Sequence, residues 1–170
     1  TYTAVYKAIT DAVPITITSQ PEGLELKITK GNGRVVTETT PFVTYMTVGN
    51  TAPVAAPQSQ GELRFSRWED GVSTRGRMIT ATAISQTYKA IYSNKVILQS
   101  IPSGLDIMFN WENVTTPAES YAEVGSEMKI YGWQYLNSLK FDQWAEGGRM
   151  RKTVVKTEEA QSFVAQYVPA

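Results

Sequence analysis

Short runs in which apolar and polar residues alternate fill most of this chain. Residues 15–18 read Ile-Thr-Ile-Thr, and residues 24–28 read Leu-Glu-Leu-Lys-Ile. An alternation with a period of two places the apolar side chains on one face of a β-strand. Turn-forming pairs such as Asp70-Gly71 separate the runs, and no stretch has a convincing helical period. The pattern therefore predicts an all-β chain.

The expected strands fall into two sets. The first set covers residues 14–20, 24–30, 34–38, 41–47, 52–57, 62–68, 76–82 and 87–92. The second set covers residues 95–101, 104–109, 118–123, 127–136, 138–144, 150–156 and 162–168. Many short strands with regular turns are typical of an antiparallel β-sandwich, so we expect one small Ig-like sandwich in each set.

The two sets are copies of one sequence pattern. Residues 65–71 read Phe-Ser-Arg-Trp-Glu-Asp-Gly, and residues 141–147 read Phe-Asp-Gln-Trp-Ala-Glu-Gly. Other landmarks recur in the same order: Pro21-x-Gly23-Leu24 with Pro102-x-Gly104-Leu105, Thr40-Pro41 with Thr116-Pro117, Val48-Gly49 with Val124-Gly125, and Tyr88-x-Ala90-x-Tyr92 with Phe163-x-Ala165-x-Tyr167. A fixed period of this size indicates stacked modules.

We therefore divide the chain into a first repeat, residues 14–92, and a second repeat, residues 95–170. Only Ser93-Asn94 joins them, and so short a connection favours a fixed relation between the modules. Residues 1–13 contain Tyr2-Thr-Ala4-Val-Tyr6, a further example of the motif that ends each repeat. We interpret this segment as a strand left from a preceding repeat plus a linker. The alternative is an extra edge strand of the first module.

The repeated aromatic residues are expected in the core. In each repeat-ending motif the two rings flank an alanine on one face of a strand, and the repeated Trp68 or Trp144 is their natural partner. Phe65 and Trp68 are three residues apart, which a regular strand would place on opposite faces. Either the strand contains a bulge there or the tryptophan lies just past its end.

Composition excludes several classes of function. The chain has 16 basic and 16 acidic residues, so nothing attracts it to nucleic acid or to an acidic membrane. Cysteine and histidine are absent, which removes disulfides, thiolate chemistry and the usual general base. No run of about 18 apolar residues exists to insert into a membrane. We predict a chain that is not an enzyme and has no cofactor.

Two charged features have plain structural interpretations. Asp70 and Glu146 follow the repeated tryptophans, but they lack the spaced oxygen ligands of a calcium loop, so no metal site is predicted. Basic residues cluster on equivalent hairpins of the two copies: Arg75, Arg77, Arg149, Arg151 and Lys152. We expect them to form solvated faces that protect sheet edges, with polyanion binding as the alternative.

Asn113-Val-Thr115 is a formal glycosylation acceptor.

The second repeat has aromatic residues that the first lacks. Tyr131, Trp133 and Tyr135 occupy alternate positions of one expected strand, where the first repeat has Ala55, Pro57 and Ser59. A flat row of rings can stack on the apolar faces of sugars. Trp111 could extend such a row or cap the sandwich. The competing interpretation is that these rings cover the other module or complete a core.

The ordered motifs resemble the divergent internalin B-type repeats of secreted bacterial and archaeal multidomain proteins. The resemblance covers residues 14–92 and 95–167 and the strand at residues 1–6. It implies a location outside the cell, secreted or on the cell surface, and other domains of a longer parent chain as partners. The relation to internalin repeats also raises a rival fold, a β-grasp with a short helix.

Two functions follow as expectations. The first is a non-catalytic structural repeat, a spacer or stalk in a larger surface or secreted protein. The second is a carbohydrate-binding or adhesive module, accessory to an extracellular enzyme, with Tyr131, Trp133, Tyr135 and Trp111 as contacts for a polysaccharide or cell-surface glycan. No nucleic acid and no membrane insertion are expected in either case.

Overall fold

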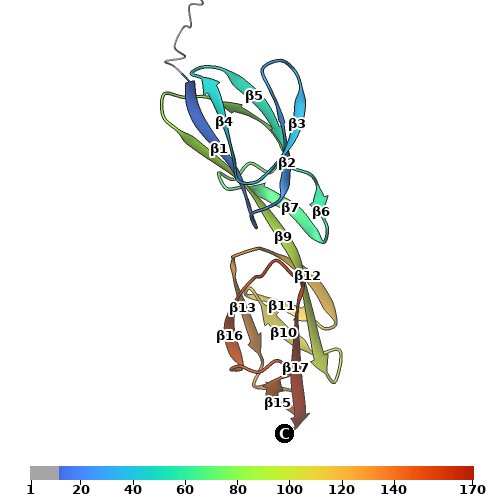
Figure 1. Cartoon of the computed structure of the whole chain (residues 1–170). Coiled ribbons are helices and arrows are strands. Elements are labelled where there is room, and N and C mark those ends of the chain that lie inside the picture. Colours follow the sequence, from blue (N-terminus) through green and yellow to red (C-terminus); the bar gives the residue numbers. More distant parts are fainter. Residues whose placement is uncertain (1–11) are drawn as a thin grey trace, which may run out of the picture. The chain divides into compact units, whose positions relative to one another are not determined.

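The computed structural model describes residues 12–170, which form strands and turns without any helix (Figure 1). The prediction of an all-β chain is therefore confirmed, and the helix that a β-grasp repeat would need is not formed in this part of the chain. The repeat-ending motif at residues 1–6 lies outside the described residues.

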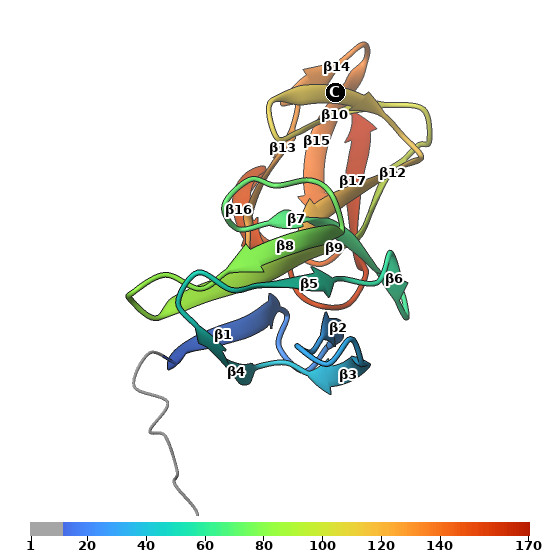
Figure 2. The same ribbon diagram turned by 90° about the horizontal axis from the view of Figure 1, so that it is seen from above.

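The first repeat contains two sheets. Its strands are β1 (Ala12–Gln20), β2 (Glu25–Thr29), β3 (Val35–Thr39), β4 (Phe42–Thr47), β5 (Thr51–Ala55), β6 (Ser59–Gln60), β7 (Leu63–Trp68), β8 (Gly76–Thr80) and the beginning of β9 (Gln86–Ile101). One sheet has the order β4-β1-β9-β7-β6, and the other has the order β3-β2-β5-β8. Figure 2 shows β1 and β4 side by side.

The second repeat has the same two sheets. Its strands are the end of β9, β10 (Asp106–Phe109), β11 (Glu112–Thr115), β12 (Ala118–Glu123), β13 (Glu127–Gly132), β14 (Tyr135–Leu136), β15 (Leu139–Trp144), β16 (Arg151–Val155) and β17 (Gln161–Pro169). One sheet runs β12-β9-β17-β15-β14, and the other runs β11-β10-β13-β16. Strand for strand, this order repeats that of the first copy.

The first and last strands of each repeat are parallel neighbours. In the first repeat β1 pairs with β9, and Ile15 lies opposite Gln86. In the second repeat β9 pairs with β17, and Val96 lies opposite Gln161. These registers agree with the sequence alignment of the two copies, so the repeat holds at the level of single residues.

Three details of the predicted strands are wrong. Ser93 and Asn94 lie inside β9, not in a connection between strands, so one strand ends the first repeat and begins the second. The expected strand at 127–136 is two strands, because the chain leaves the β13 sheet after Gly132 and enters the other sheet at Tyr135. Strand β11 was not expected at all.

The described residues form two compact units whose boundary differs from that of the repeats. One unit contains residues 12–58 and 67–91, and the other contains residues 59–66 and 92–170. The hairpin of β6 and β7 therefore belongs largely to the second unit, although its sequence belongs to the first repeat.

Most of the predicted core residues are buried in both copies, whereas Tyr88, Phe65 and Phe141 are half-buried. In the second unit, one sheet contributes Trp144 and the β17 residues Phe163, Ala165 and Tyr167, and the other contributes residues such as Ile130 to the same cluster. Trp68, Ala90 and Tyr92 are equally buried. Two inward faces that share one apolar cluster define a β-sandwich. Strand β15 has a register shift between Phe141 and Gln143, so the bulge alternative is the correct one there.

The repeated Pro-x-Gly-Leu and Thr-Pro motifs meet at a buried hydroxyl pair. In the first repeat Ser19 Oγ hydrogen-bonds to Thr40 Oγ1 at 2.5 Å, and in the second repeat Ser100 and Thr116 form the same pair. Gly23 N donates to the carbonyl oxygen of Thr40 at 3.0 Å, with the glycine at a φ of 85° that other residues rarely adopt. The motifs recur because they join two connections at one end of each sandwich.

Candidate functional site

Each repeat contains a cation held between two aromatic rings. The guanidinium carbon of Arg77 lies 5.3 Å from the ring centroid of Trp68 and 4.7 Å from that of Tyr88. At the equivalent place in the second repeat, Lys152 Nζ lies 4.5 Å from the ring of Trp144 and 5.0 Å from that of Phe163. Such contacts are favourable because the face of an aromatic ring carries negative potential.

The acidic residue of the Trp-x-[Asp/Glu]-Gly motif completes this arrangement. Asp70 accepts two hydrogen bonds from Arg77, at 2.9 Å and 2.7 Å, and Glu146 pairs with Lys152. The hydrogen bonds from Arg77 hold the pKa of Asp70 below its usual value of 3.8. The motif is therefore a structural one, in which the glycine N–H also closes a tight turn onto the tryptophan carbonyl.

This arrangement corrects one sequence expectation. Strands β8 and β16 are edge strands, as predicted for the basic hairpins. The side chains of Arg77 and Lys152, however, are only 14% and 12% exposed. They pack against rings and do not belong to a solvated face, whereas Arg75, Arg149 and Arg151 are exposed as expected. Arg77 Nε is buried without a hydrogen-bond partner.

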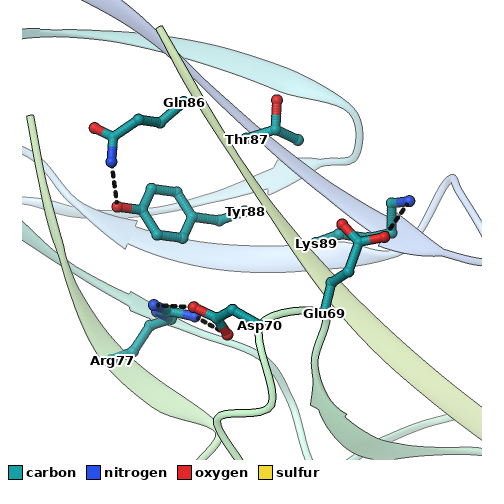
Figure 3. Close-up of a pocket in the computed structure, with 7 residues that line it drawn as sticks. All are labelled: Glu69, Asp70, Arg77, Gln86, Thr87, Tyr88 and Lys89. Carbon is teal, nitrogen blue, oxygen red and sulfur yellow. Dashed lines mark hydrogen bonds and ion pairs between the residues drawn. The ribbon is translucent and has the colours of Figure 1, made fainter. Parts of the chain in front are cut away.

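A hollow of about 330 Å³ lies beside Arg77 in the first unit (Figure 3). Its charged side chains are all paired: Asp70 with Arg77, and Glu69 Oε1 with Lys89 Nζ at 3.0 Å. Gln86 Nε2 donates to the hydroxyl of Tyr88 at 3.1 Å, so the polar groups of the hollow mostly satisfy one another.

The second unit has a smaller, more aromatic hollow of about 210 Å³. Its lining residues are Met108, Trp111, Tyr131, Gly132, Trp133 and Arg151. The rings of Trp111 and Tyr131 are 5.3 Å apart and nearly perpendicular, at 82°, and Arg151 lies 5.6 Å above the ring of Tyr131. Trp111 is 68% exposed and Trp133 is 37% exposed. The hollow thus combines accessible indoles with one cation at its side.

The predicted row of three rings on one strand is wrong. Of the three rings, only Tyr131 lies on β13. Trp133 lies in the connection between the sheets, and Tyr135 begins β14 in the other sheet. The structure brings Trp111, Tyr131 and Trp133 together and leaves Tyr135, which is 62% exposed, outside the hollow. At the crossing, Gly132 N donates to Met150 O, next to the last pair of β13 and β16, and Trp133 N then donates to the Tyr167 hydroxyl of the other sheet at 2.9 Å. Sequence reasoning missed Arg151 and Met108 as neighbours of these rings.

Trp111 occupies an unusual backbone position. Asn110 and Trp111 form the two-residue turn between β10 and β11, with φ values of 47° and 72°. A two-residue turn with both φ angles positive favours Asn followed by Gly, because a side chain in the left-handed region costs about 1 kcal/mol. The backbone conformation at Trp111 therefore disfavours a large side chain. An exposed ring at such a position is a reason to look for a ligand there.

The second repeat also contains a buried lysine. Lys156 is 1% exposed and stands where the first repeat has Ala81. Its Nζ donates to the carbonyl oxygens of Thr157 and Glu159, at 2.8 Å and 2.5 Å, while Asn94 Nδ2 donates to that of Glu158. Burial lowers the pKa of Lys156 below its ordinary value of 10.5. The lysine thus holds the loop before β17 by its backbone.

Within residues 12–170 no three acidic side chains come together in a group that could hold a metal ion. The same residues contain no helix suited to crossing a bilayer. Asn113 is exposed on β11, and the hydroxyl of Thr115, the third residue of the acceptor tripeptide, donates to Asp106 Oδ1 at 2.6 Å. Glycosylation at Asn113 stays a prediction.

No family model matches the chain, and no curated protein matches it. Solved structures with a similar arrangement include the Bacillus anthracis TIE protein, with a TM-score of 0.33 and 8% identity over 94% of this chain and 34% of that one. Two others are the shaft pilin spaA from Lactobacillus rhamnosus GG (TM-score 0.28, 7% identity, 94% and 98% covered) and the major pilin T-13 from Streptococcus pyogenes (TM-score 0.28, 10% identity, 94% and 97% covered).

The chain thus spans about a third of the first of these proteins. At such low similarity the function has to be argued from the residues of this chain.

Proposed function

We propose that the chain is a non-catalytic tandem repeat that acts as a spacer or stalk in a longer protein outside the cell. The observation that supports this most directly is the pairing of terminal strands. In each repeat the first and last strands are parallel neighbours, and β9 serves as the last strand of one repeat and the first of the next.

Parallel terminal strands suit a segment that carries tension. The chain enters at the amino end of β1 and leaves the first repeat near the middle of β9, after Tyr92. A pull on the two ends slides these strands past each other, so the hydrogen bonds from Ile15–Gln86 to Gln20–Ile91 are loaded together. The β9–β17 pair of the second repeat is loaded in the same way. Breaking many bonds at once requires a larger force than breaking them in succession.

The chemistry of the described residues is consistent with a structural role. The acids that line the hollow beside Arg77 are engaged with cations, and both repeated tryptophans are buried with their indole N–H groups bonded to carbonyl oxygens at 3.0 Å. We assign the motifs that resemble internalin B-type repeats to this architecture. The partners we propose are further domains of the parent chain, and the proposed location is secreted or on the cell surface.

Single-molecule force spectroscopy tests the proposal. The sequence has no cysteine, so engineered cysteines give unique attachment points. We expect a high rupture force when the chain is pulled by its ends. The matched control attaches the same handles at Glu25 and Thr39, which face each other at the open end of the β2–β3 hairpin, so that the pull opens pairs one by one. Equal rupture forces in the two geometries would contradict a load-bearing role.

A second candidate function is binding of a glycan in the aromatic hollow. It is favoured by the exposed Trp111 in a turn that prefers glycine, with Tyr131, Trp133 and Arg151 beside it. Aromatic faces stack on sugar rings, and a guanidinium can bond hydroxyl or carboxylate groups at their rim.

Tryptophan fluorescence titrations with a polysaccharide panel test this candidate. Trp111→Ala and Trp133→Ala should each abolish a response that wild type shows. Tyr135→Ala is the matched control, because Tyr135 is equally exposed but lies outside the hollow. The candidate fails if no glycan changes the fluorescence of wild type, or if Tyr135→Ala weakens binding as much as Trp111→Ala does.

A further inference from the structure

The second unit contains a hairpin packed on a strand through two polar contacts. The guanidinium carbon of Arg64, on β7, lies 4.3 Å from the ring centroid of Tyr121 on β12. Ser66 Oγ donates to Glu123 Oε1 at 2.8 Å. Arg64 and Ser66 occupy alternate positions of β7, as Tyr121 and Glu123 do on β12, so one face of each strand takes part.

Strand β4 of the first repeat is the equivalent of β12. Among the described residues, no hairpin packs on the corresponding face of β4. The registers of β4 on β1 and of β12 on β9 make Tyr45 equivalent to Tyr121, and Thr47 equivalent to Glu123. Tyr45 is 72% exposed, whereas Tyr121 is half-buried. Val48, which follows Thr47 in the first repeat, is 43% exposed, whereas its equivalent Val124, which follows Glu123, is 7% exposed.

The second repeat also has the matching hairpin. Strands β14 and β15 pair Tyr135 with Lys140, in the register by which β6 and β7 pair Ser59 with Arg64. Lys140 is therefore the equivalent of Arg64, and Asp142 is the equivalent of Ser66. Both Lys140 and Asp142 are exposed.

The face of β4 that carries Tyr45 and Thr47 is complementary to the face of the β14–β15 hairpin that carries Lys140 and Asp142. Lys140 would supply the cation for the ring of Tyr45, as Arg64 does for Tyr121. Asp142 would accept a hydrogen bond from the hydroxyl of Thr47, which reverses donor and acceptor relative to the pair of Ser66 and Glu123 but keeps the bond. We propose that the β14–β15 hairpin docks on strand β4 of a second copy of this chain, end to end. The inference rests on the proposed spacer function.

The two surfaces of such a contact lie on different parts of the molecule, so it does not close on itself. A contact of this kind extends copies into an open chain unless the rotation happens to form a ring. The contact involves few side chains, so we expect a dissociation constant on the order of 0.1–1 mM between separate copies. In a longer array, the covalent link would raise the local concentration enough to hold the contact closed.

Concentration-dependent NMR spectra of the whole chain test the proposal. As the concentration rises to about 1 mM, amide signals of Tyr45, Thr47, Lys140 and Asp142 should shift together. Lys140→Glu and Tyr45→Ala should each raise the half-association concentration about tenfold or more. Lys27→Glu is the charge-matched control, because Lys27 is exposed on β2, and this variant should associate as wild type does. Tyr45 is outside the core, so circular dichroism should show Tyr45→Ala fully folded.

A mixing experiment gives the sharpest answer. Lys140→Glu retains an intact β4, and Tyr45→Ala retains an intact hairpin, so each is monomeric alone but the mixture forms one-to-one pairs. Adding unlabelled Tyr45→Ala to labelled Lys140→Glu should then shift β4 signals. Absence of shifts in wild type up to about 1 mM, or association that survives Lys140→Glu, would overturn the proposal. Either result would leave the force measurement on the single chain unaffected, so the spacer function is judged separately.

Discussion

Arg77 and Lys152 occupy equivalent positions in the two repeats, and each lies over the indole ring of the repeated tryptophan, at 5.3 Å and 4.5 Å. The cation differs between the copies, and so does the acid that pairs with it, Asp70 or Glu146. The arrangement of ring, cation and acid is the same. What the repeat preserves is therefore an interaction, not the identity of each residue.

We predict that Asp70→Asn lowers the free energy of unfolding at neutral pH by about 0.5–1 kcal/mol, because a bidentate ion pair is lost from a partly exposed site. The pKa of Asp70 is lowered in the folded state, so its contribution is present above pH 3.8 and is lost as the pH falls through the folded-state value. Urea unfolding of wild type and variant should thus converge in acid.

The control for this prediction is Asp142→Asn, which changes an exposed carboxylate at no ion pair of the described residues. A deficit of Asp70→Asn that persists undiminished in strong acid would show that the ion pair is not its cause.

Gly132 marks the point where the chain leaves one sheet for the other. A Cβ atom on Gly132 would lie 2.5 Å from Cδ2 of Phe141, so a side chain there forces the ring to move. The first repeat has Ala56 at this place, which shows that the sandwich can adjust to one methyl group. We expect Gly132→Ala to cost about 1 kcal/mol and Gly132→Val about 2–3 kcal/mol in chemical denaturation.

Gly76→Ala is the matched glycine control, because a Cβ atom there would meet nothing within 4 Å. This variant should unfold within about 0.5 kcal/mol of wild type. Equal stability of Gly132→Val and Gly76→Ala would refute the close approach of Phe141.

Buried Lys156 makes stability depend on alkaline pH. Its folded-state pKa is lowered, so between that value and 10.5 the unfolded chain binds more protons than the folded chain, and the stability rises with pH. Lys156→Met removes this term. Wild type should therefore gain stability relative to Lys156→Met as the pH approaches 10.5.

Denaturation curves at neutral pH and near pH 10.5 measure this difference. Lys27→Met, at an exposed lysine, should show no such trend relative to wild type. A constant difference between wild type and Lys156→Met across this range would mean that burial does not perturb the lysine.

Trp111 is expected to contribute little to stability. Trp111→Gly relieves a positive φ angle, a gain of about 1 kcal/mol, and loses the edge contact with Tyr131, a cost of about 0.5–1.5 kcal/mol. The variant should therefore remain within about 1 kcal/mol of wild type in thermal or urea unfolding, whereas Trp144→Ala should lose about 3–5 kcal/mol. A loss of more than about 2 kcal/mol for Trp111→Gly would make its ring structural and remove the main support for a glycan site.

Much of the fold was predictable because the alternation of side chains and the duplication reinforce each other. The errors arose where alternation continued through a change of sheet. The sequence Tyr131-x-Trp133-x-Tyr135 has the period of one strand, but the chain changes sheet within it, where Trp133 N bonds to the hydroxyl of Tyr167, a residue distant in sequence.

Other errors had local causes. The turn at Asn110-Trp111 lacks the glycine by which such a hairpin turn is usually predicted, so β11 was not predicted. Ser93 and Asn94 are polar and resemble a linker, yet both are buried within β9. The positions of Arg77 and Lys152 between rings depend on strands that meet only in the folded chain, and a charge pattern along the sequence does not indicate them.

The offset between the repeat and the compact unit has a practical consequence for anyone who wishes to isolate a piece of this protein. A cut at Ser93-Asn94, where the sequence period suggests a border, would sever β9 and separate residues 59–66 from the unit to which they belong. The duplicated segment and the compact unit thus have different boundaries. Expression of a single unit would need its missing hairpin supplied, by fusion or as a peptide.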